Sequence, residues 1–105
     1  MLLEWTVQVL PGVRLVLCEP FVLPVDETRQ LWRSEVDQRR AVVADLAREF
    51  GTSLVPFQKE FDGALQSHDA KHLAPDGVHP TEFGHDLMAE WWIRHVSRVS
   101  CETNR

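Results

Sequence analysis

Two short apolar stretches on either side of one long helical pattern limit the fold of this chain most strongly. Residues 13–18 are almost continuously apolar, which is typical of a strand buried on both faces of a parallel sheet. From about residue 28 to residue 50, apolar side chains recur at steps of three and four, and Gly51 is a good helix stop. Residues 52–55 form the second short stretch. Strand, long helix and strand predict a βαβ unit with a right-handed crossover, and therefore an α/β fold.

Three further segments have helical patterns. Residues 1–10 are apolar and are followed by Pro11-Gly12, as at the end of a helix. Residues 57–66 carry apolar side chains on one helical face. The clearest helix spans about residues 81–99, because acidic side chains lie early in it and arginines lie late, as the helix dipole favours. A chain of 105 residues forms one domain at most, and a sheet of only two strands is marginal when alone.

The composition argues against several classes of partner and location. The net charge is −5 and the basic residues are scattered, so we expect no nucleic-acid partner. No apolar run approaches the ~20 residues that a membrane span needs. Residues 1–5 lack the basic region of a signal peptide. We therefore expect a cytoplasmic protein without a membrane partner, and we leave open that an intact relative is secreted.

A loop rich in proline and glycine, residues 74–81, holds the chemically most informative side chains. Asp76-Gly77 favours a tight turn in which the glycine adopts a positive φ. Pro80 favours an extended backbone at His79, and Thr81 is a good N-cap for the helix that follows. The loop therefore holds a histidine rigidly, three residues after a carboxylate that can bond its ring nitrogen. An acid orients a general base in this way in an Asp-His pair.

The same loop and the residues after it carry a resemblance to a known family. The run Asp76-Gly77-Val78-His79-Pro80-Thr81, followed by Gly84-His85 and Leu87-Met88-Ala89, resembles the C-terminal motif of the SGNH/GDSL hydrolases. Residues 13–21 also resemble a strand and loop that precede this motif in the family. These proteins are esterases and acyl hydrolases with a flavodoxin-like, three-layer α/β/α fold. The resemblance covers about residues 10–99.

The resemblance implies that this chain is the C-terminal half of such a domain. Residues 1–99 would form the partial domain, and residues 100–105 would be a disordered tail. In the Ser-His-Asp triad of the family, Asp76 corresponds to the acid and His79 to the base. The family requires neither a cofactor nor a metal, and none is expected here.

Two motif blocks of the family are absent from the sequence. The nucleophile of the family lies in a Gly-Asp-Ser block. A glycine and a Gly-x-Asn-Asp block complete the oxyanion hole. Neither the Gly-Asp-Ser block nor the Gly-x-Asn-Asp block occurs here. We therefore expect the chain to be inactive or nearly so by itself. One hypothesis is a truncated or split ester hydrolase for acyl or acetyl esters, such as acetylated carbohydrate, completed by an N-terminal half-domain chain. The other is a non-catalytic remnant or interaction domain. An exposed sheet edge favours self-association in either case.

Two sets of side chains suggest a metal as an alternative. His68 and His72 are four residues apart and could form a metal pair on a helix, but no third ligand of a known pattern follows. Asp76, His79 and His85 could form a zinc site. For His85 we favour a structural role beside Gly84.

Several other side chains near these motifs are interpreted as structural. We expect tryptophans to pack in the core or at its edge rather than to form a substrate platform, and Cys18 to be a small core residue. Glu19-Pro20-Phe21 is expected to line the rim of the site in a full-length relative. The tryptophans concerned are Trp32, Trp91 and Trp92.

Overall fold

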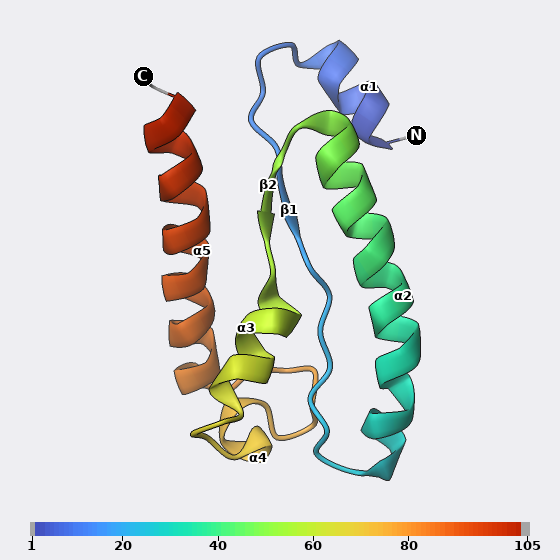
Figure 1. Cartoon of the computed structure of the whole chain (residues 1–105), viewed down its shortest axis with the longest axis vertical. Coiled ribbons are helices and arrows are strands. Elements are labelled where there is room, and N and C mark those ends of the chain that lie inside the picture. The colour runs from blue at the N-terminus through green and yellow to red at the C-terminus, as the bar shows by residue number, and fades with distance from the viewer. Residues whose placement is uncertain (1, 104–105) are drawn as a thin grey trace.

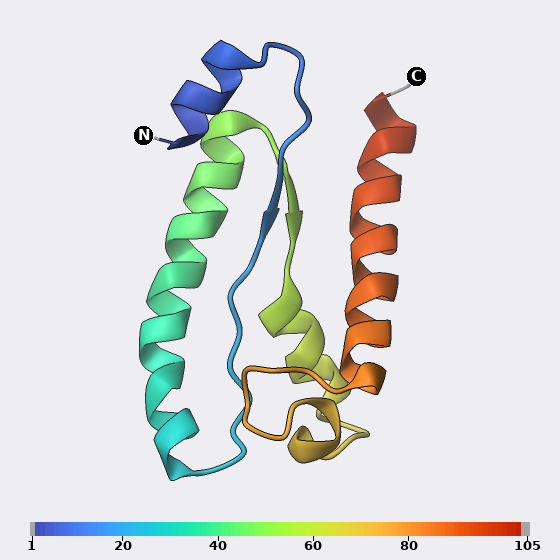
Figure 2. The same ribbon diagram turned by 180° about the vertical axis from the view of Figure 1, so that it is seen from behind.

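Two parallel strands lie between two long helices (Figure 1). The strands are β1 (Val16–Cys18) and β2 (Ser53–Val55), with α2 (Glu27–Phe50) on one side and α5 (Glu82–Thr103) on the other. The view from behind shows the same order of layers (Figure 2). This computed structural model describes residues 2–103, and the side chains of residues 2–96. The architecture is α/β, mostly helical, with a small parallel sheet.

The predicted strand–helix–strand unit is present, but its strands are short. Val16 pairs with Ser53 and Cys18 pairs with Val55 in a parallel register. The prediction of a strand from residue 13, buried on both faces with Cys18 in the core, is wrong, because β1 begins at Val16 and Cys18 is exposed. Within residues 2–103 the sheet has two strands. Because the sheet is so narrow, the helices packed on it do not fully cover both faces of β1.

Helix α2 begins and ends through the local signals that its sequence carries. The Asp26 side chain caps its first turn by accepting a hydrogen bond from the Arg29 N–H at 2.8 Å. At the other end, Gly51 has a φ of 62° and its N–H donates to carbonyls of the last turn. On the outer face Arg39 donates to Glu35 at 2.7 Å, as their spacing predicts. Both side chains are about two-thirds exposed, so this pair adds little stability.

The shorter helices match the predictions except for one. α1 spans Leu2–Val9, α3 spans Phe57–Ala64 and α4 spans Ala70–Leu73. α1 and α3 lie where helical patterns were expected, whereas α4 was not predicted. It is a single turn, which is too short for a periodic pattern to be visible. Its N-cap is Asp69, whose side chain accepts a hydrogen bond from the Lys71 N–H at 3.0 Å.

Helix α5 is longer than its sequence pattern indicated. It continues to Thr103, past the expected end near residue 99. The domain boundary expected at residues 99 and 100 stays a prediction. Among the residues that the structure describes, no helix is long and apolar enough to cross a membrane.

Phe61 of α3 lies at the centre of the hydrophobic core. Its side chain is fully buried, and its ring centroid lies 4.6 Å from that of Phe21 and 4.9 Å from that of Trp91. The Phe61 and Trp91 rings meet edge to face, a favourable aromatic geometry. Trp91 thus has its predicted packing role, while Trp92 lies at the edge and is 39% exposed. The other members of the core cluster are Leu23, Val55, Phe57, Leu73 and Ala74.

Glu19 is a buried carboxylate that caps a helix. Its Oε1 atom accepts hydrogen bonds from the N–H groups of Gln58 at 2.8 Å and Lys59 at 3.2 Å, in the first turn of α3. Its Oε2 atom lies 3.1 Å from Nε of Arg40. These partners compensate for burial of the charge, and the helix dipole favours it there. The expectation that Glu19 lines a site rim is therefore wrong, and Phe21 packs in the core.

The first turn of α5 packs so closely on Leu73 that Gly84 has no room for a side chain. A Cβ atom at Gly84 would overlap the Leu73 carbonyl oxygen. We expect Gly84→Ala to reduce the free energy of unfolding by about 2–3 kcal/mol, because helix and loop must move apart. Gly63→Ala is the matched control: Gly63 lies in α3 with no atom within 4 Å of its Cβ position, so alanine should stabilise by about 0.5–1 kcal/mol. Urea unfolding measures both, and equal effects would contradict this packing.

Trp91 and Trp92 are neighbours on α5 that differ in burial, so they form a second matched pair. Trp91 is 7% exposed and Trp92 is 39% exposed. We expect Trp91→Ala to cost about 3–5 kcal/mol, because it leaves a cavity beside Phe61. Trp92→Ala should cost clearly less in the same urea unfolding experiment. The reverse order would mean that α5 presents its other face to the core.

Candidate functional site

The loop of residues 74–81 joins α4 to α5 at the end of the molecule toward which both strands point (Figure 1). Binding sites of parallel α/β sheets lie at this carboxyl edge. Gly77 has a φ of 86°, and its N–H donates to the Ala74 carbonyl at 2.9 Å to close the predicted turn. A Cβ atom at Gly77 would lie 2.7 Å from the Leu23 carbonyl oxygen. The turn therefore requires glycine for its φ and for the space around it.

Thr81 ties the far end of the loop to α4 and starts α5. Its hydroxyl donates to the His72 carbonyl at 2.8 Å and accepts from the Gly84 N–H at 3.0 Å. Its own N–H donates to the Leu73 carbonyl at 2.8 Å. Thr81 is thus the N-cap that the sequence predicts. Because both ends of the loop are bonded to buried structure, the side chains between them have a defined position.

Asp76 and His79 form the hydrogen-bonded pair that the sequence predicts. Nδ1 of His79 lies 2.6 Å from Oδ2 of Asp76. The other carboxylate oxygen, Oδ1, accepts the N–H groups of Val78 at 3.0 Å and His79 at 2.7 Å. Since an ionised carboxylate can only accept, the imidazole must carry a proton on Nδ1, which leaves Nε2 of a neutral ring free to accept another. The His79 side chain is 85% exposed, so an external group can reach it.

The same bonds keep the acid of the pair ionised. The N–H of Val78 and then the ring and N–H of His79 hold the pKa of the Asp76 carboxyl well below its usual range. An anion at this position stabilises the imidazolium that forms when His79 takes a proton. The arrangement can therefore act as an oriented general base.

The other side chains considered as site residues do not join the Asp76–His79 pair. The rings of His68 and His72 both pack against Phe83, with centroids 5.0 Å and 4.8 Å from it. His85 lies exposed on α5. Over the described part of the chain, no three side chains of His, Cys, Asp or Glu are grouped as a metal ion requires. Trp32, expected to pack, is instead 42% exposed.

Arg29 contacts the site and was not predicted from the sequence. Its Nε donates to the main-chain carbonyl of Asp76 at 2.6 Å, across 47 positions of the sequence. No motif marks this residue, because its role depends on how the start of α2 meets the loop. From the helical spacing of the sequence, one learns only that Arg29 lies near the beginning of α2.

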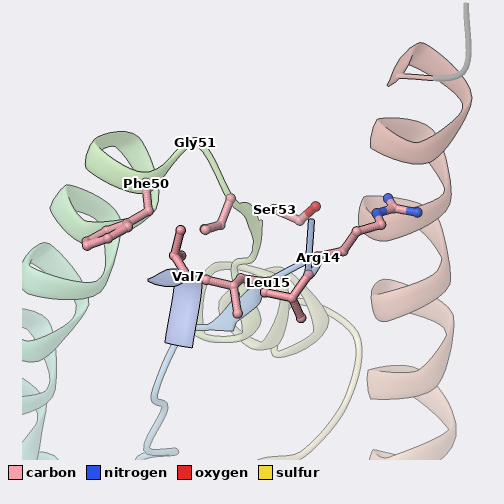
Figure 3. Close-up of a pocket in the computed structure, with 8 residues that line it drawn as sticks. Val7, Arg14, Leu15, Phe50, Gly51 and Ser53 are labelled. Atoms are coloured by element: carbon pink, nitrogen blue, oxygen red, sulfur yellow. The ribbon is translucent and has the colours of Figure 1, made fainter. Parts of the chain in front are cut away.

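A hollow of about 290 Å³ lies at the opposite end of the sheet, where both strands begin (Figure 3). Val7, Leu15 and Phe50 give it apolar walls. None of the site residues expected from the sequence lines it. The hollow is therefore separate from the Asp76–His79 site.

The depressed pKa of Asp76 predicts a pH dependence of stability. The folded-state pKa lies below the unfolded value of about 3.9, so the stabilisation is present above about pH 4 and is lost as the pH falls toward the folded-state pKa. We expect Asp76→Asn to lower the melting temperature at about pH 7. The difference from the unsubstituted chain should shrink between about pH 4 and about pH 2. Thermal unfolding followed by circular dichroism tests this, and a difference constant with pH would contradict it.

Comparison with known proteins finds similarity to proteins that are named as esterases, lipases or hydrolases. No family model matches the chain. An acetylxylan esterase of Geobacillus stearothermophilus is 30% identical over 82 residues, which are 78% of this chain and 37% of that protein. The structure of a protein described as a GDSL-like lipase, from Parabacteroides merdae, matches 91% of this chain with a TM-score of 0.84 and 38% identity.

Two further solved structures agree with this result. A variant of an acetyl xylan esterase from Geobacillus stearothermophilus matches 90% of this chain with a TM-score of 0.75 and 28% identity. An α/β hydrolase from the metagenome of Lake Arreo matches 90% with a TM-score of 0.74 and 26% identity. The matched parts cover 43–45% of the three solved chains, so this chain spans less than half the length of its relatives. In its motif, its fold and these relatives, the chain is similar to the SGNH/GDSL-type hydrolases.

Proposed function

We propose that this chain supplies the acid and the base of a Ser-His-Asp ester hydrolase, as the C-terminal half of a flavodoxin-like α/β/α domain. Asp76 orients His79, and His79 is the general base. The observation that carries the proposal is the 2.6 Å contact between Nδ1 of His79 and Oδ2 of Asp76 on an exposed ring. The substrate class is acyl or acetyl esters, and the acetylxylan esterases among the relatives support acetylated carbohydrate.

The proposed reaction needs a serine from outside this chain. As that hydroxyl attacks the ester carbonyl, Nε2 of His79 takes its proton and then returns it to the leaving alcohol. Water later cleaves the acyl-enzyme with His79 again as the base. Asp76 stays ionised throughout and stabilises the imidazolium. Ser53 illustrates why a local serine does not fit: it is buried in β2, beside the hollow at the opposite end of the sheet.

A complementary half-domain is part of the proposal. The relatives are more than twice as long as the matched segment, and the sheet described here has two strands. Further strands beside β1 would widen the sheet and provide positions for the nucleophile and the oxyanion hole. This half could be a separate N-terminal chain that assembles with the present one. In this proposal the assembled hydrolase works in the cytoplasm and binds neither nucleic acid nor membrane.

A non-catalytic interaction domain is the second candidate. Apolar side chains on and after α1 are largely exposed, and they follow one another at helical spacing. Surfaces of this kind mark sites of association with a partner or with a second copy of the chain. The side chains are Leu2, Trp5, Val9 and Leu10, exposed by 55–71%.

Hydrolysis of a short-chain chromogenic acetate ester is the first test. We expect the purified chain and His79→Ala, prepared identically, to show the same background rate, because no nucleophile accompanies the pair. His79→Ala should leave the fold intact, since the side chain is 85% exposed. A rate that disappears in the variant would instead reveal a nucleophile within this chain.

A chimera tests the roles of the pair directly. In it, this chain replaces the matching segment of the Geobacillus stearothermophilus acetylxylan esterase. We expect acetate ester hydrolysis that His79→Ala reduces by about 10³-fold or more, because the base and nucleophile act as a unit. His85→Ala, an exposed histidine of the same chain, is the control and should change the rate by less than about threefold. A folded chimera whose activity ignores His79 would refute the assignment, and a folded inactive one would favour the interaction domain.

A further inference from the structure

The backbone of the Asp76–Gly77 turn is bonded to the segment that leads into α2. The N–H of Leu23 donates to the Gly77 carbonyl at 2.9 Å, and Nε of Arg29 donates to the Asp76 carbonyl at 2.6 Å. Two consecutive carbonyl groups of the turn are thus held by residues far away in the sequence. The first bond is made by the main chain, and the second depends on one side chain.

Contacts other than its bond to the Asp76 carbonyl also hold Arg29 in place. Its main-chain N–H is bonded to the N-cap residue of α2. Its guanidinium group lies over the ring of Trp32, one turn further along the helix, with 4.0 Å between Cζ and the ring centroid. Its Cγ atom packs over Gly77, 3.2 Å from the point where a Cβ would stand. A planar guanidinium stacked in this way loses little freedom when it donates to the loop.

The bond from Arg29 fixes the residue that carries the acid of the pair. The main-chain carbonyl and the carboxylate of Asp76 share one Cα atom, so holding the carbonyl limits the directions in which the carboxylate can point. On the other side of that Cα, the carboxylate must meet Val78 N–H, His79 N–H and the His79 ring together. A rotation of the peptide would therefore disturb the geometry of these contacts.

We propose that Arg29 is a positioning residue for the Asp76–His79 pair, acting through the Asp76 carbonyl and held there by Trp32. This positioning role rests on the proposed function, whereas the contacts of Arg29 do not depend on it. Arg29 bonds the carbonyl and not the carboxylate. It therefore acts by geometry, and a lysine, which keeps the charge but lacks the planar stack, should replace it incompletely.

Nuclear magnetic resonance of the whole chain tests this without any ester substrate. The Asp76 carboxyl is titrated by its ¹³C shift, and the Nδ1 proton of His79 is observed directly. We expect Arg29→Ala to raise the Asp76 titration midpoint by about 1 pH unit or more and to broaden the Nδ1 proton signal beyond detection. Arg29→Lys should give a smaller change in the same direction. Arg39→Ala, which breaks an exposed pair on the outer face of α2, should leave both signals unchanged.

Melting temperatures of the same samples separate positioning from general loss of structure. A folded Arg29→Ala chain with the Asp76 midpoint within about 0.3 pH unit of the unsubstituted chain would overturn the proposal. If Arg29→Ala does not fold, Trp32→Leu removes the stack and keeps the guanidinium; a raised midpoint supports the proposal and an unchanged one overturns it. Since neither readout involves hydrolysis, an inactive chimera with an intact pair would count against the proposed function and not against the role of Arg29.

Discussion

The hydrogen bond between the Leu23 N–H and the Gly77 carbonyl is the contact on which the geometry of the site depends. It joins the segment after β1 to the loop before α5, two parts of the chain that meet only in the folded state. Leu23 is fully buried, so the loop is attached directly to the hydrophobic core. The contact is possible because Gly77 lacks a Cβ atom, which would approach the Leu23 carbonyl to 2.7 Å. A loop without regular structure obtains its rigidity in this way from a packed scaffold.

The two ends of the molecule are stabilised differently. At the carboxyl edge of the sheet, polar groups from distant segments satisfy one another: Glu19 caps α3, and Arg29 holds the loop. At the amino edge, apolar side chains of and after α1 remain exposed, with Leu2 at 71% and Trp5 at 66%. Contacts within this chain therefore hold the site in place, whereas the apolar side chains at the opposite end remain exposed. This contrast agrees with a chain that spans less than half the length of its relatives.

The sequence allowed the Asp76–His79 contact to be predicted because the turn that brings the two side chains together is encoded locally, although Leu23 and Arg29 then hold this turn from distant parts of the chain. The acid and the base are three residues apart, and Gly77, Pro80 and Thr81 act on the backbone within the same loop. Two of the errors concern side chains whose surroundings are set by distant parts of the chain. Glu19 bonds residues 39 and 40 positions away, so no local pattern distinguishes a buried cap from a residue at a site rim. Cys18 followed an apolar pattern, but its exposure depends on the width of the sheet.

The sequence by itself determined the strand–helix–strand order, the ends of α2 and the turn that brings Asp76 to His79. Hydrophobic periodicity, capping and turn preferences act over a few residues and can be read along the chain. Only the tertiary structure decided that Leu23 and Arg29 hold this turn, that Leu73 leaves no room for a side chain at Gly84, and that Glu19 is buried. These contacts arise when packing of the core brings together segments that are well separated along the chain, and no local preference encodes which of them will meet.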